Sequence, residues 1–541
     1  MQAKLGSRIL DLHRPAISRR ELMVGAGLIA GGLVLGGVLD ACGATTQTVA
    51  QASPKRGGNF RFGTLGSSKD IMDAQNSLSN GDIARQMASF ETLLQFDLSN
   101  KLTAELGLAE SVTQDAADQW TIRLKQGIEF HNGKTLTADD VIYSLQRILK
   151  ADLGLFGYSN LSPSLDPKNM QKLDDRTVRL HLTRGDSTID TQLAQYYNTI
   201  VPAGYAPYPA PQIGTGPFKL QTFTAGEQTI FVRNPNYWRT GQPYFDQVTI
   251  IEFADASGRV NALLAGQVDA IDDLPTAQVN VVKAHPGFAV LESSSGDWLP
   301  IEMAIDMPPF TDVRVRQAFR LMADRPQFVA QAVAGHGTVA NDLYSPYDPC
   351  FATDLPQRHQ DIEKAKSLLK AAGQAGLTMD FHTTPNAEAM VTEAYVFAEQ
   401  AKKAGVTLNV KNDPNYYGDQ YLKLALSTDN WFSHSYLDQV GEGNIPSANW
   451  DATHWPPKDA SGDRYVSLYN QALAAVDKAK RCELIHEMQV MEYNEGGHLI
   501  AFFVNNISAY STKVSGFKPS KGDPPTLDAY GYGFRTIWFN S

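Results

Sequence analysis

Hydrophobic and polar residues alternate over several short stretches of the chain, as they do in strands with one buried face. The alternation is plain in Asn59–Thr64, Trp120–Leu124 and Val178–Leu182. Each stretch has the usual length of a strand. The pattern therefore predicts strands at these three places.

A helical pattern lies between the second and third of these strands. Residues 137–149 repeat apolar side chains at three- and four-residue intervals, which places them on one helix face. Thr137 stands where an N-cap is expected, and Asp140 follows three residues later, as in a capping box. Strands and helix together predict an α+β region between residues 91 and 204.

The second half of the chain alternates helix and strand patterns. Helices are predicted over 361–372 and 387–404, and strands over 377–381 and 406–410. Gly373, directly after the first helix, is a typical helix stop. A helix between two strands favours a parallel-containing sheet with helices on its faces. The predicted fold class is therefore α/β (α+β).

Two more helical patterns flank this region, one from Thr311 or Asp312 onward and one over Arg464–Glu495 with a break. With 541 residues, the chain is expected to contain two or three domains. Hydrophobic residues make up 43% and charged residues 19% of the chain. This balance can bury several cores and argues against a mostly disordered protein.

Charge and cysteine content exclude several classes of protein. The net charge is −11, so long-range attraction to nucleic acid or to anionic lipid is not supported. Only Cys42, Cys350 and Cys482 occur, without the spacing of a structural zinc site. A disulfide framework is not expected, and Cys350 and Cys482 are predicted to be ordinary thiols.

The N-terminal residues have the pattern of an export signal. Ser18-Arg19-Arg20 precedes the uncharged stretch Leu22–Leu39, and Cys42 follows, which is the order of a basic region, an apolar region and a processing site. A membrane anchor is the alternative, because the apolar stretch is just long enough to span a bilayer. Its many glycines weaken a membrane helix, however. We therefore predict a signal peptide over residues 1–41.

The basic residues resemble a twin-arginine signal, and Leu39-Asp40-Ala41-Cys42 resembles a lipobox, in which the cysteine is lipidated and becomes the new N-terminus. Asp40 departs from the small uncharged residue usual at its place. Residues 42–56 are mostly small and polar, as in a flexible tether. The mature protein is thus predicted in the periplasm or at the outer face of the cell membrane, anchored through Cys42.

Motifs of common enzyme and metal sites are missing. The sequence has no GxSxG, HExxH or GxxxxGK[ST] pattern, and its 11 histidines form no dense cluster. His486-Glu487 begins like a zinc-protease motif, but Val490 occupies the place of its second histidine. No metal and no cofactor are therefore expected. Hydrolysis by two carboxylates brought together in space remains an alternative, because a sequence does not report that distance.

Five stretches in order carry a resemblance to a known family. The longest is Leu108–Arg147, which includes Phe130-His131-Asn132-Gly133 and Thr137-Ala138-Asp139-Asp140-Val141. The others are Gly214–Phe218, Arg233–Trp238, Asp312–Phe319 and Asp361–Gly373. They resemble the extracytoplasmic solute-binding proteins of family 5, the dipeptide, oligopeptide and nickel binders of ABC importers. The resemblance extends from about Gly57 to the C-terminus.

The resemblance implies a two-lobed clamp of the type II periplasmic binding protein kind, with an additional inserted domain. Lobe I would comprise residues 57–90, 205–302 and 505–541, the inserted domain II residues 91–204, and lobe III residues 303–504. The chain would cross between the lobes near Pro300–Asp306 and near Phe503–Asn506. Two crossing strands would form a hinge that closes around a ligand.

In peptide-binding relatives, lobe III carries a Trp and, three residues later, an Asp that pairs with the α-ammonium of the peptide. The matching stretch here is Trp431-Phe432-Ser433-His434, so a histidine replaces that carboxylate. An imidazole cannot serve as the counter-ion of a buried ammonium. Either Asp438 takes over this role, or the ligand lacks a free α-ammonium. An ordinary packed or surface histidine is the alternative for His434.

The resemblance places further residues at the cleft. Leu65-Gly66-Ser67 match the segment of lobe I that lines the other jaw, and Tyr158 of domain II falls where relatives offer an aromatic side chain. Trp431 and Phe432 are expected to cover ligand side chains, with plain core packing as the alternative.

The function implied by the resemblance is capture of a peptide or peptide-like small solute. The protein would act as a monomer without enzymatic activity and would deliver the ligand to an ABC permease with its ATPase subunits. A secreted hydrolase and a ligand sensor that does not transport are the alternatives.

Overall fold

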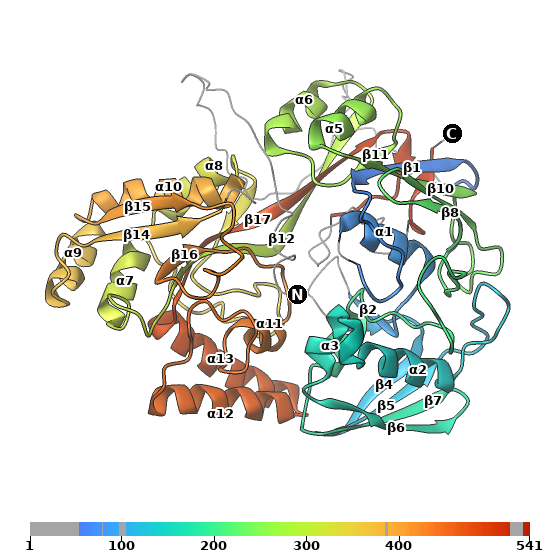
Figure 1. The fold of residues 1–541 in the computed structure, drawn as a ribbon, viewed down its shortest axis with the longest axis horizontal. Coiled ribbons are helices and arrows are strands. Elements are labelled where there is room, and N and C mark those ends of the chain that lie inside the picture. Colours follow the sequence, from blue (N-terminus) through green and yellow to red (C-terminus); the bar gives the residue numbers. More distant parts are fainter. Residues whose placement is uncertain (1–53, 78, 97–103, 385–387, 520–533, 541) are drawn as a thin grey trace, which may run out of the picture.

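The computed structural model describes residues 54–77, 79–96, 104–384, 388–519 and 534–540. Figure 1 shows two halves joined by the long strands β12 (Phe288–Met303) and β17 (His498–Ser511). The predictions for the signal peptide over 1–41 and for Cys42 lie outside the described residues. Within the described part of the chain, no helix is both long and apolar enough to cross a membrane.

One sheet of 11 strands extends through both halves, in the order β15-β14-β16-β12-β17-β11-β1-β10-β9-β8, with β13 paired to β17 beside this path. β12 and β17 pair antiparallel from Phe288 and Ser511 to Glu302 and His498, so both strands belong to each half. The other strands are β1 (Asn59–Leu65), β8 (Phe218–Thr224), β9 (Gln228–Arg233), β10 (Gln247–Phe253), β11 (Ala270–Ile271), β13 (Gly337–Val339), β14 (Thr378–Thr383), β15 (Thr407–Asn412) and β16 (Leu426–Thr428).

In the half that contains β1, parallel pairing dominates the centre of the sheet. β1 pairs in parallel with β10 and with β11. Phe60 and Phe62 point into a fully buried core, which confirms the strand predicted over Asn59–Thr64. The helices beside this part of the sheet are α1 (Asn80–Ser89), α5 (Ala256–Leu264), the 3-10 helix η2 (Thr276–Gln278) and α6 (Val279–Ala284). The region predicted as domain II, described below, belongs to the same half (Figure 1).

The other half contains the predicted strand–helix–strand unit. β14 pairs in parallel with β15 and β16, and α10 (Glu388–Lys402) connects β14 to β15. The predicted break in the last helical pattern lies at Ala475–Asp477. The remaining helices of this half are α7 (Val313–Met322), α8 (Arg325–Ala332), α9 (Ile362–Ala371), α11 (Tyr436–Gly443), α12 (Ala460–Ala474) and α13 (Lys478–Glu495). The α/β prediction is confirmed.

A separate antiparallel sheet, in the order β4-β5-β7-β6, forms within the predicted domain II. The capping box at the start of α2 is present, since the carboxylate of Asp140 accepts hydrogen bonds from the backbone N–H and the hydroxyl of Thr137 at 3.0 and 2.9 Å. The elements of this region are β4 (Ala109–Ala116), β5 (Gln119–Leu124), α2 (Ala138–Ile148), η1 (Ala151–Leu153), α3 (Phe156–Leu161), β6 (Leu165–Asp174), β7 (Thr177–Leu182) and α4 (Ile189–Ala194).

Two small sheets lie outside these layers. β2 (Leu94–Phe96) pairs with β3 (Ala104–Leu106), and β18 (Val514–Ser515) pairs with β19 (Trp538–Phe539).

The pairing of β12 with β17 is irregular where the strands pass from one half to the other. Register shifts occur between Ser294 and Asp297 and again between Trp298 and Pro300. Such irregularities interrupt the hydrogen-bond ladder and bend a strand, which suits a hinge. The crossings predicted near Pro300–Asp306 and Phe503–Asn506 lie at or beside this stretch, while the domain limits themselves stay predictions.

The prediction that Cys350 and Cys482 are ordinary thiols is wrong, because the two residues form a disulfide. Their Cα atoms are 4.8 Å apart, although 132 residues separate them along the chain. The bond ties the loop after β13 to the beginning of α13. Sequence spacing could not indicate it, because the two cysteines meet only through the packing of α13 in the second half.

We expect reduction of this disulfide to lower stability. A bond that closes so long a loop typically contributes about 2–4 kcal/mol to the free energy of unfolding. Cys482→Ser and Cys350→Ser should lower the unfolding midpoint in urea equally, and the double variant should add nothing further. Equal midpoints for the wild-type protein with and without a reducing agent would contradict the assignment.

Glu393 on α10 gives a second test, because its side chain lies between the core residues Met390 and Phe397. Among the described residues, neither oxygen of Glu393 has a hydrogen-bond partner, and burial raises the pKa of this carboxyl well above its ordinary value. Folding therefore takes up a proton here. The stability linked to that proton is present in acid and is lost as the pH rises through the folded-state pKa.

We expect Glu393→Gln to flatten the pH dependence of stability above pH 5. Glu393→Met should raise the free energy of unfolding at neutral pH by about 1–3 kcal/mol, because it removes an unpaired buried polar group. Urea titrations at pH 5 and pH 8 measure both effects. Glu363→Gln, at an exposed position of α9, is the matched control. The burial argument fails if both variants keep the wild-type pH profile.

Candidate functional site

Both halves of the large sheet contain parallel strands, and ligands of open α/β sheets bind beyond the carboxyl ends of such strands. In one half β1 ends at Leu65, and Gly66-Ser67 follow directly. In the other half β16 ends at Thr428, and Trp431–His434 follow shortly after. The structure thus places both predicted jaw segments at carboxyl ends of parallel strands.

The segment after β1 is held by a buried charged group. A side chain at Gly66 would collide with Glu252, because a Cβ atom there would lie 2.5 Å from the Glu252 carboxylate. Glu252 is paired with the fully buried Arg85, and burial raises the pKa of this carboxyl. The Ser67 hydroxyl donates to Asp70 at 3.0 Å. The backbone is therefore fixed, while the Leu65 side chain stays 38% exposed.

The segment after β16 is fastened to the crossing strand β12. Trp431 and Trp298 exchange two backbone hydrogen bonds of 3.0 Å, and their rings stack with centroids 5.6 Å apart. The backbone N–H of Ser433 donates to Asp297 of β12 at 2.9 Å. Phe432, between these anchors, keeps 40% of its side chain exposed. Asp297 and Trp298 hold this predicted segment in place, and the sequence did not indicate either residue.

His434 lies beside an acidic residue of α11. Its Nδ1 is 3.0 Å from Oε2 of Glu442, and both side chains are mostly buried. A carboxylate can only accept, so this contact places a proton on Nδ1. The structure therefore brings a carboxylate to the imidazole at the position where relatives carry Asp.

Asp438 is turned toward the other half of the molecule. Its carboxylate accepts hydrogen bonds from Ser435 Oγ at 2.5 Å, Thr191 Oγ1 at 3.0 Å and Gln192 Nε2 at 2.5 Å. Thr191 and Gln192 belong to α4. Burial is the main reason that the pKa of Asp438 rises to about 7. Its oxygens are thus engaged by groups of the protein itself.

Tyr158 is half-buried on α3, a helix that packs against α4. The neighbouring aromatic residues Phe156, Tyr196 and Tyr197 form a contact chain with centroid distances of 6.2 and 5.0 Å. The place of Tyr158 at the site stays a prediction, because the contacts of the described residues link α3 to α4 and not to either jaw segment.

Two buried carboxylates lie behind Trp431. Asp429 accepts hydrogen bonds from the hydroxyls of Tyr417 and Tyr421, each at 2.8 Å. Burial raises the pKa of Asp429 to about 6 and that of Glu302 well above its ordinary value. Both side chains are at most 2% exposed, so this pair does not offer a hydrolase an accessible acid and base.

His454, in the stretch after α11, has a structural environment. Its Nδ1 contacts Asp306 and its Nε2 lies 3.0 Å from the carbonyl oxygen of Leu422. Among the residues that the structure describes, no three His, Cys, Asp or Glu side chains are arranged to hold a metal ion.

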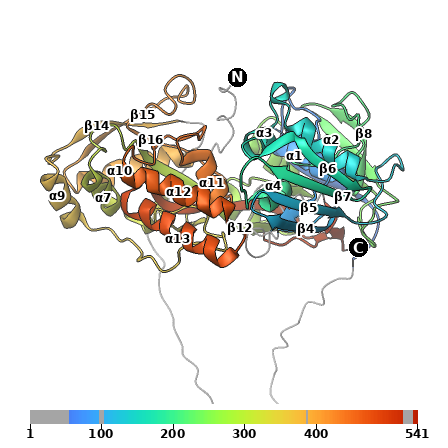
Figure 2. The same cartoon turned by 90° about the horizontal axis from the view of Figure 1, so that it is seen from below.

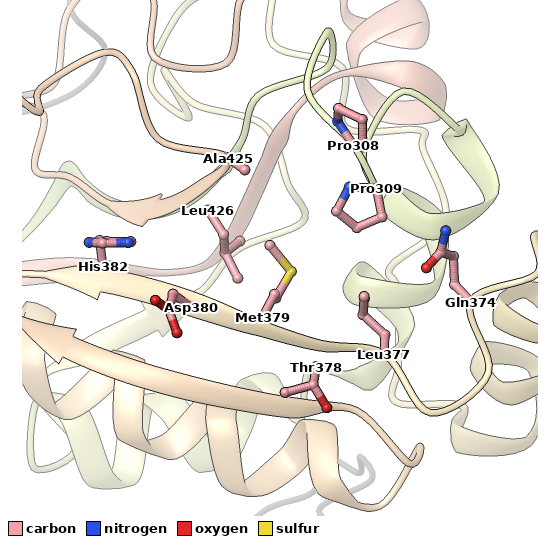
Figure 3. Close-up of a pocket in the computed structure, with 10 residues that line it drawn as sticks. All are labelled: Pro308, Pro309, Gln374, Leu377, Thr378, Met379, Asp380, His382, Ala425 and Leu426. Atoms are coloured by element: carbon pink, nitrogen blue, oxygen red, sulfur yellow. The ribbon is translucent and has the colours of Figure 1, made fainter.

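A hollow of about 480 Å³ lies on the half that contains β14. Figure 3 shows that it lies between β14, which contributes Asp380 and His382, and the loop containing Pro308 and Pro309. None of its lining residues is a predicted site residue.

Known proteins resemble this chain over most of its length. Heme-binding protein A of Haemophilus influenzae is 27% identical, with 79% of this chain and 83% of that protein covered. Di/tripeptide-binding protein 1 of Pseudomonas aeruginosa is 24% identical, with 80% and 86% covered. Glutathione-binding protein GsiB of Escherichia coli is 24% identical, with 83% and 89% covered.

Solved structures show the same fold. The ABC transporter substrate-binding protein CtaP of Listeria monocytogenes superposes with a TM-score of 0.79 at 20% identity, covering 90% of this chain and 100% of that one. The periplasmic binding protein DppA of Helicobacter pylori, in complex with the peptide STSA, gives 0.71 at 18% identity, covering 90% and 99%. These are type II periplasmic binding protein clamps, as predicted.

The family model of bacterial extracellular solute-binding proteins, family 5 Middle, matches residues 103–460, well over half of the chain. The chain therefore belongs to the family 5 bacterial extracellular solute-binding proteins.

Proposed function

We propose that this protein captures a peptide or peptide-like small solute outside the cytoplasm and delivers it to an ABC permease. The supporting observation is the pair of jaw segments, Leu65–Ser67 and Trp431–His434, at carboxyl ends of parallel strands in two halves joined by β12 and β17. The relatives named for di- and tripeptides and for glutathione support the same class of ligand.

In this proposal the two exposed apolar side chains, Leu65 and Phe432, cover the ligand from the two jaws. The backbone on both sides of Phe432 is fixed by the hydrogen bonds of Trp431 and Ser433. The Phe432 side chain is therefore in place before the ligand binds. Trp431 provides a rigid wall because it stacks on Trp298. Apolar walls with few polar groups are typical of small-molecule sites.

His434 and Glu442 together carry one negative charge when the imidazole is neutral. In the proposal this pair takes the place of the single carboxylate of peptide-binding relatives, and Asp438 does not contact the ligand. The pair accepts a hydrogen-bond donor of the ligand through the imidazole instead of forming a direct ion pair. A ligand with a blocked or shielded amino group therefore suits the site.

The compartment is inferred from three features. Members of this family are extracellular proteins. The disulfide between Cys350 and Cys482 suits an oxidising compartment, since disulfides are rare in the cytosol. The twin-arginine-like residues Arg19-Arg20 and the lipobox-like Cys42 complete the proposal of an exported, lipid-anchored monomer.

Ligand binding is the first prediction from this proposal. Thermal unfolding with a panel of peptides, N-acetylated peptides and glutathione should give at least one saturable shift, because a ligand at a hundred times its dissociation constant stabilises by about 2.7 kcal/mol. Phe432→Ala should weaken that ligand roughly tenfold through lost apolar burial. Leu173→Ala, at an equally exposed leucine of β6, should leave affinity unchanged.

His434→Asp separates the two kinds of peptide. It restores a carboxylate, so it should tighten binding of a free peptide relative to its N-acetylated form. Equal affinities for both peptides in both proteins would show that His434 does not face the ligand. Turnover of the bound peptide on long incubation would contradict a purely binding function.

Export and anchoring form a separate prediction. Replacing Arg19 and Arg20 by Lys should leave the precursor inside the cell, because a twin-arginine signal depends on both guanidinium groups. Cys42→Ala should abolish acyl-chain labelling without changing the melting temperature. A labelled Cys42→Ala protein would refute the anchor, and an exported double-Lys variant would refute the twin-arginine route.

A further inference from the structure

A contact away from the hinge strands joins the two halves of the molecule. Figure 2 shows α11 and α12 of one half beside α4 of the other. At this place the carboxylate of Asp438 on α11 accepts hydrogen bonds from two side chains of α4, Thr191 Oγ1 at 3.0 Å and Gln192 Nε2 at 2.5 Å. Both donors are neutral, and the group they bind is buried.

The chain just before α4 packs closely on the same half. The hydroxyl of Ser187 donates to the carbonyl oxygen of Ala472 on α12 at 3.3 Å. A Cβ atom on Gly185 would lie 2.9 Å from the Cα atom of Ala474, so only a residue without a side chain allows this approach. The segment from Gly185 to Gln192 therefore packs closely on α11 and α12, which form its docking surface.

We propose that the contact of Asp438 with Thr191 and Gln192 is a closure latch, which forms when the two halves close and which slows release of the ligand without touching it. The inference rests on the proposed function. Because α4 and α11 lie outside β12 and β17, a hinge motion of these strands that opens the halves separates Asp438 from its two donors. Asp438 is thus a positioning residue and not a ligand group.

The latch accommodates a proton. Gln192 can only donate through its amide nitrogen, but the hydroxyls of Thr191 and Ser435 can turn from donor to acceptor. A protonated Asp438 therefore keeps all three hydrogen bonds, with Oδ1 accepting from Gln192 and the acid O–H donating to a hydroxyl. Asn at this position keeps an oxygen that accepts from Gln192 and offers the N–H groups of its amide to the hydroxyls of Thr191 and Ser435.

Closure is consequently linked to pH. Burial raises the pKa of Asp438 to about 7 in the closed molecule, whereas a solvent-exposed Asp has a pKa of about 4. Closing therefore takes up a proton, so the closed form gains stability as the pH falls through 7 and loses it as the pH rises. The titratable and charged groups around Asp438 and its docking surface include His434, Glu442, Arg184, Asp186, Asp190, Asp348, Tyr469, Asp477, Lys478 and Arg481.

Dissociation kinetics test the latch. N-acetyltrialanine, whose amino group is blocked, and reduced glutathione are the probes, and stopped-flow tryptophan fluorescence measures their release from the full chain. Asp438→Ala should speed release about tenfold, and Thr191→Val, which removes one donor from the opposite half, by a few fold. Thr113→Val, on the exposed face of β4, is the matched control and should change nothing. Unchanged release in both Asp438→Ala and Thr191→Val overturns the proposal.

The pH profile separates a latch from a merely structural contact. Wild-type affinity should be about tenfold higher at pH 6 than at pH 8, as a closed-state pKa of about 7 requires. Asp438→Asn should bind nearly equally at both values, because the variant has no carboxyl at this position to take up a proton. An identical pH dependence of the two proteins overturns the proton linkage and, with it, the role of Asp438.

Failure of the proposed function can be told apart from failure of the latch. If neither probe binds the wild-type protein, the ligand class is wrong, and small-angle X-ray scattering of the ligand-free protein tests the latch by itself. The wild-type protein should be more compact at pH 6 than at pH 8, and Asp438→Asn should not change. If Asp438→Ala does not fold, Thr191→Val and Gln192→Met apply the same test from α4.

Discussion

The antiparallel pairing of β12 with β17 is the interaction on which the rest of the architecture depends. These two strands belong to the sheet of both halves, and the register shifts between Ser294 and Pro300 lie where the halves meet. A regular ladder would make one rigid sheet. An interrupted ladder keeps the two halves connected and leaves the connection able to bend. These two strands connect the halves, so the position of each jaw segment relative to the other depends on them.

The second jaw is attached directly to this connection. Trp298 exchanges backbone hydrogen bonds with Trp431, and Asp297 accepts from Ser433, so the segment that ends in His434 moves with β12. The first jaw is fixed differently, through the buried Arg85 and Glu252 beneath Gly66. One jaw is therefore tied to the hinge and the other to the interior of its own half. In the proposed function, hinge bending changes the distance between the jaws without remodelling either of them.

Buried carboxylates occur both inside one half and at the contact between the two halves, and they differ in what surrounds them. Asp429 is enclosed by tyrosine hydroxyls of its own half, whereas Asp438 is completed by α4 of the opposite half. Burial raises the pKa of each. In the proposed latch, Asp438 loses its burial when the halves separate, whereas Asp429 keeps its partners within its own half.

Local patterns in the sequence determined much of the fold. The strands around Phe60, Trp120 and Val178 and the helix that begins at Thr137 were predictable, because their burial follows the period of a strand or a helix. β12 was not, because its central residues Glu292–Asp297 are polar and their burial comes from β17 and not from a hydrophobic face. The disulfide of Cys350 was missed for the same kind of reason, since its partner lies 132 residues away.

The sequence by itself thus determined the class of fold and the family resemblance, and it predicted the two jaw segments. Only the tertiary structure decided what the polar residues of these segments do. His434 and Asp438 are only four residues apart, yet His434, just before α11, meets Glu442 of that helix, and Asp438, on α11, meets α4 of the opposite half. Local propensity depends on neighbours along the chain, whereas the charge state and partners of a buried group depend on what the rest of the chain packs against it.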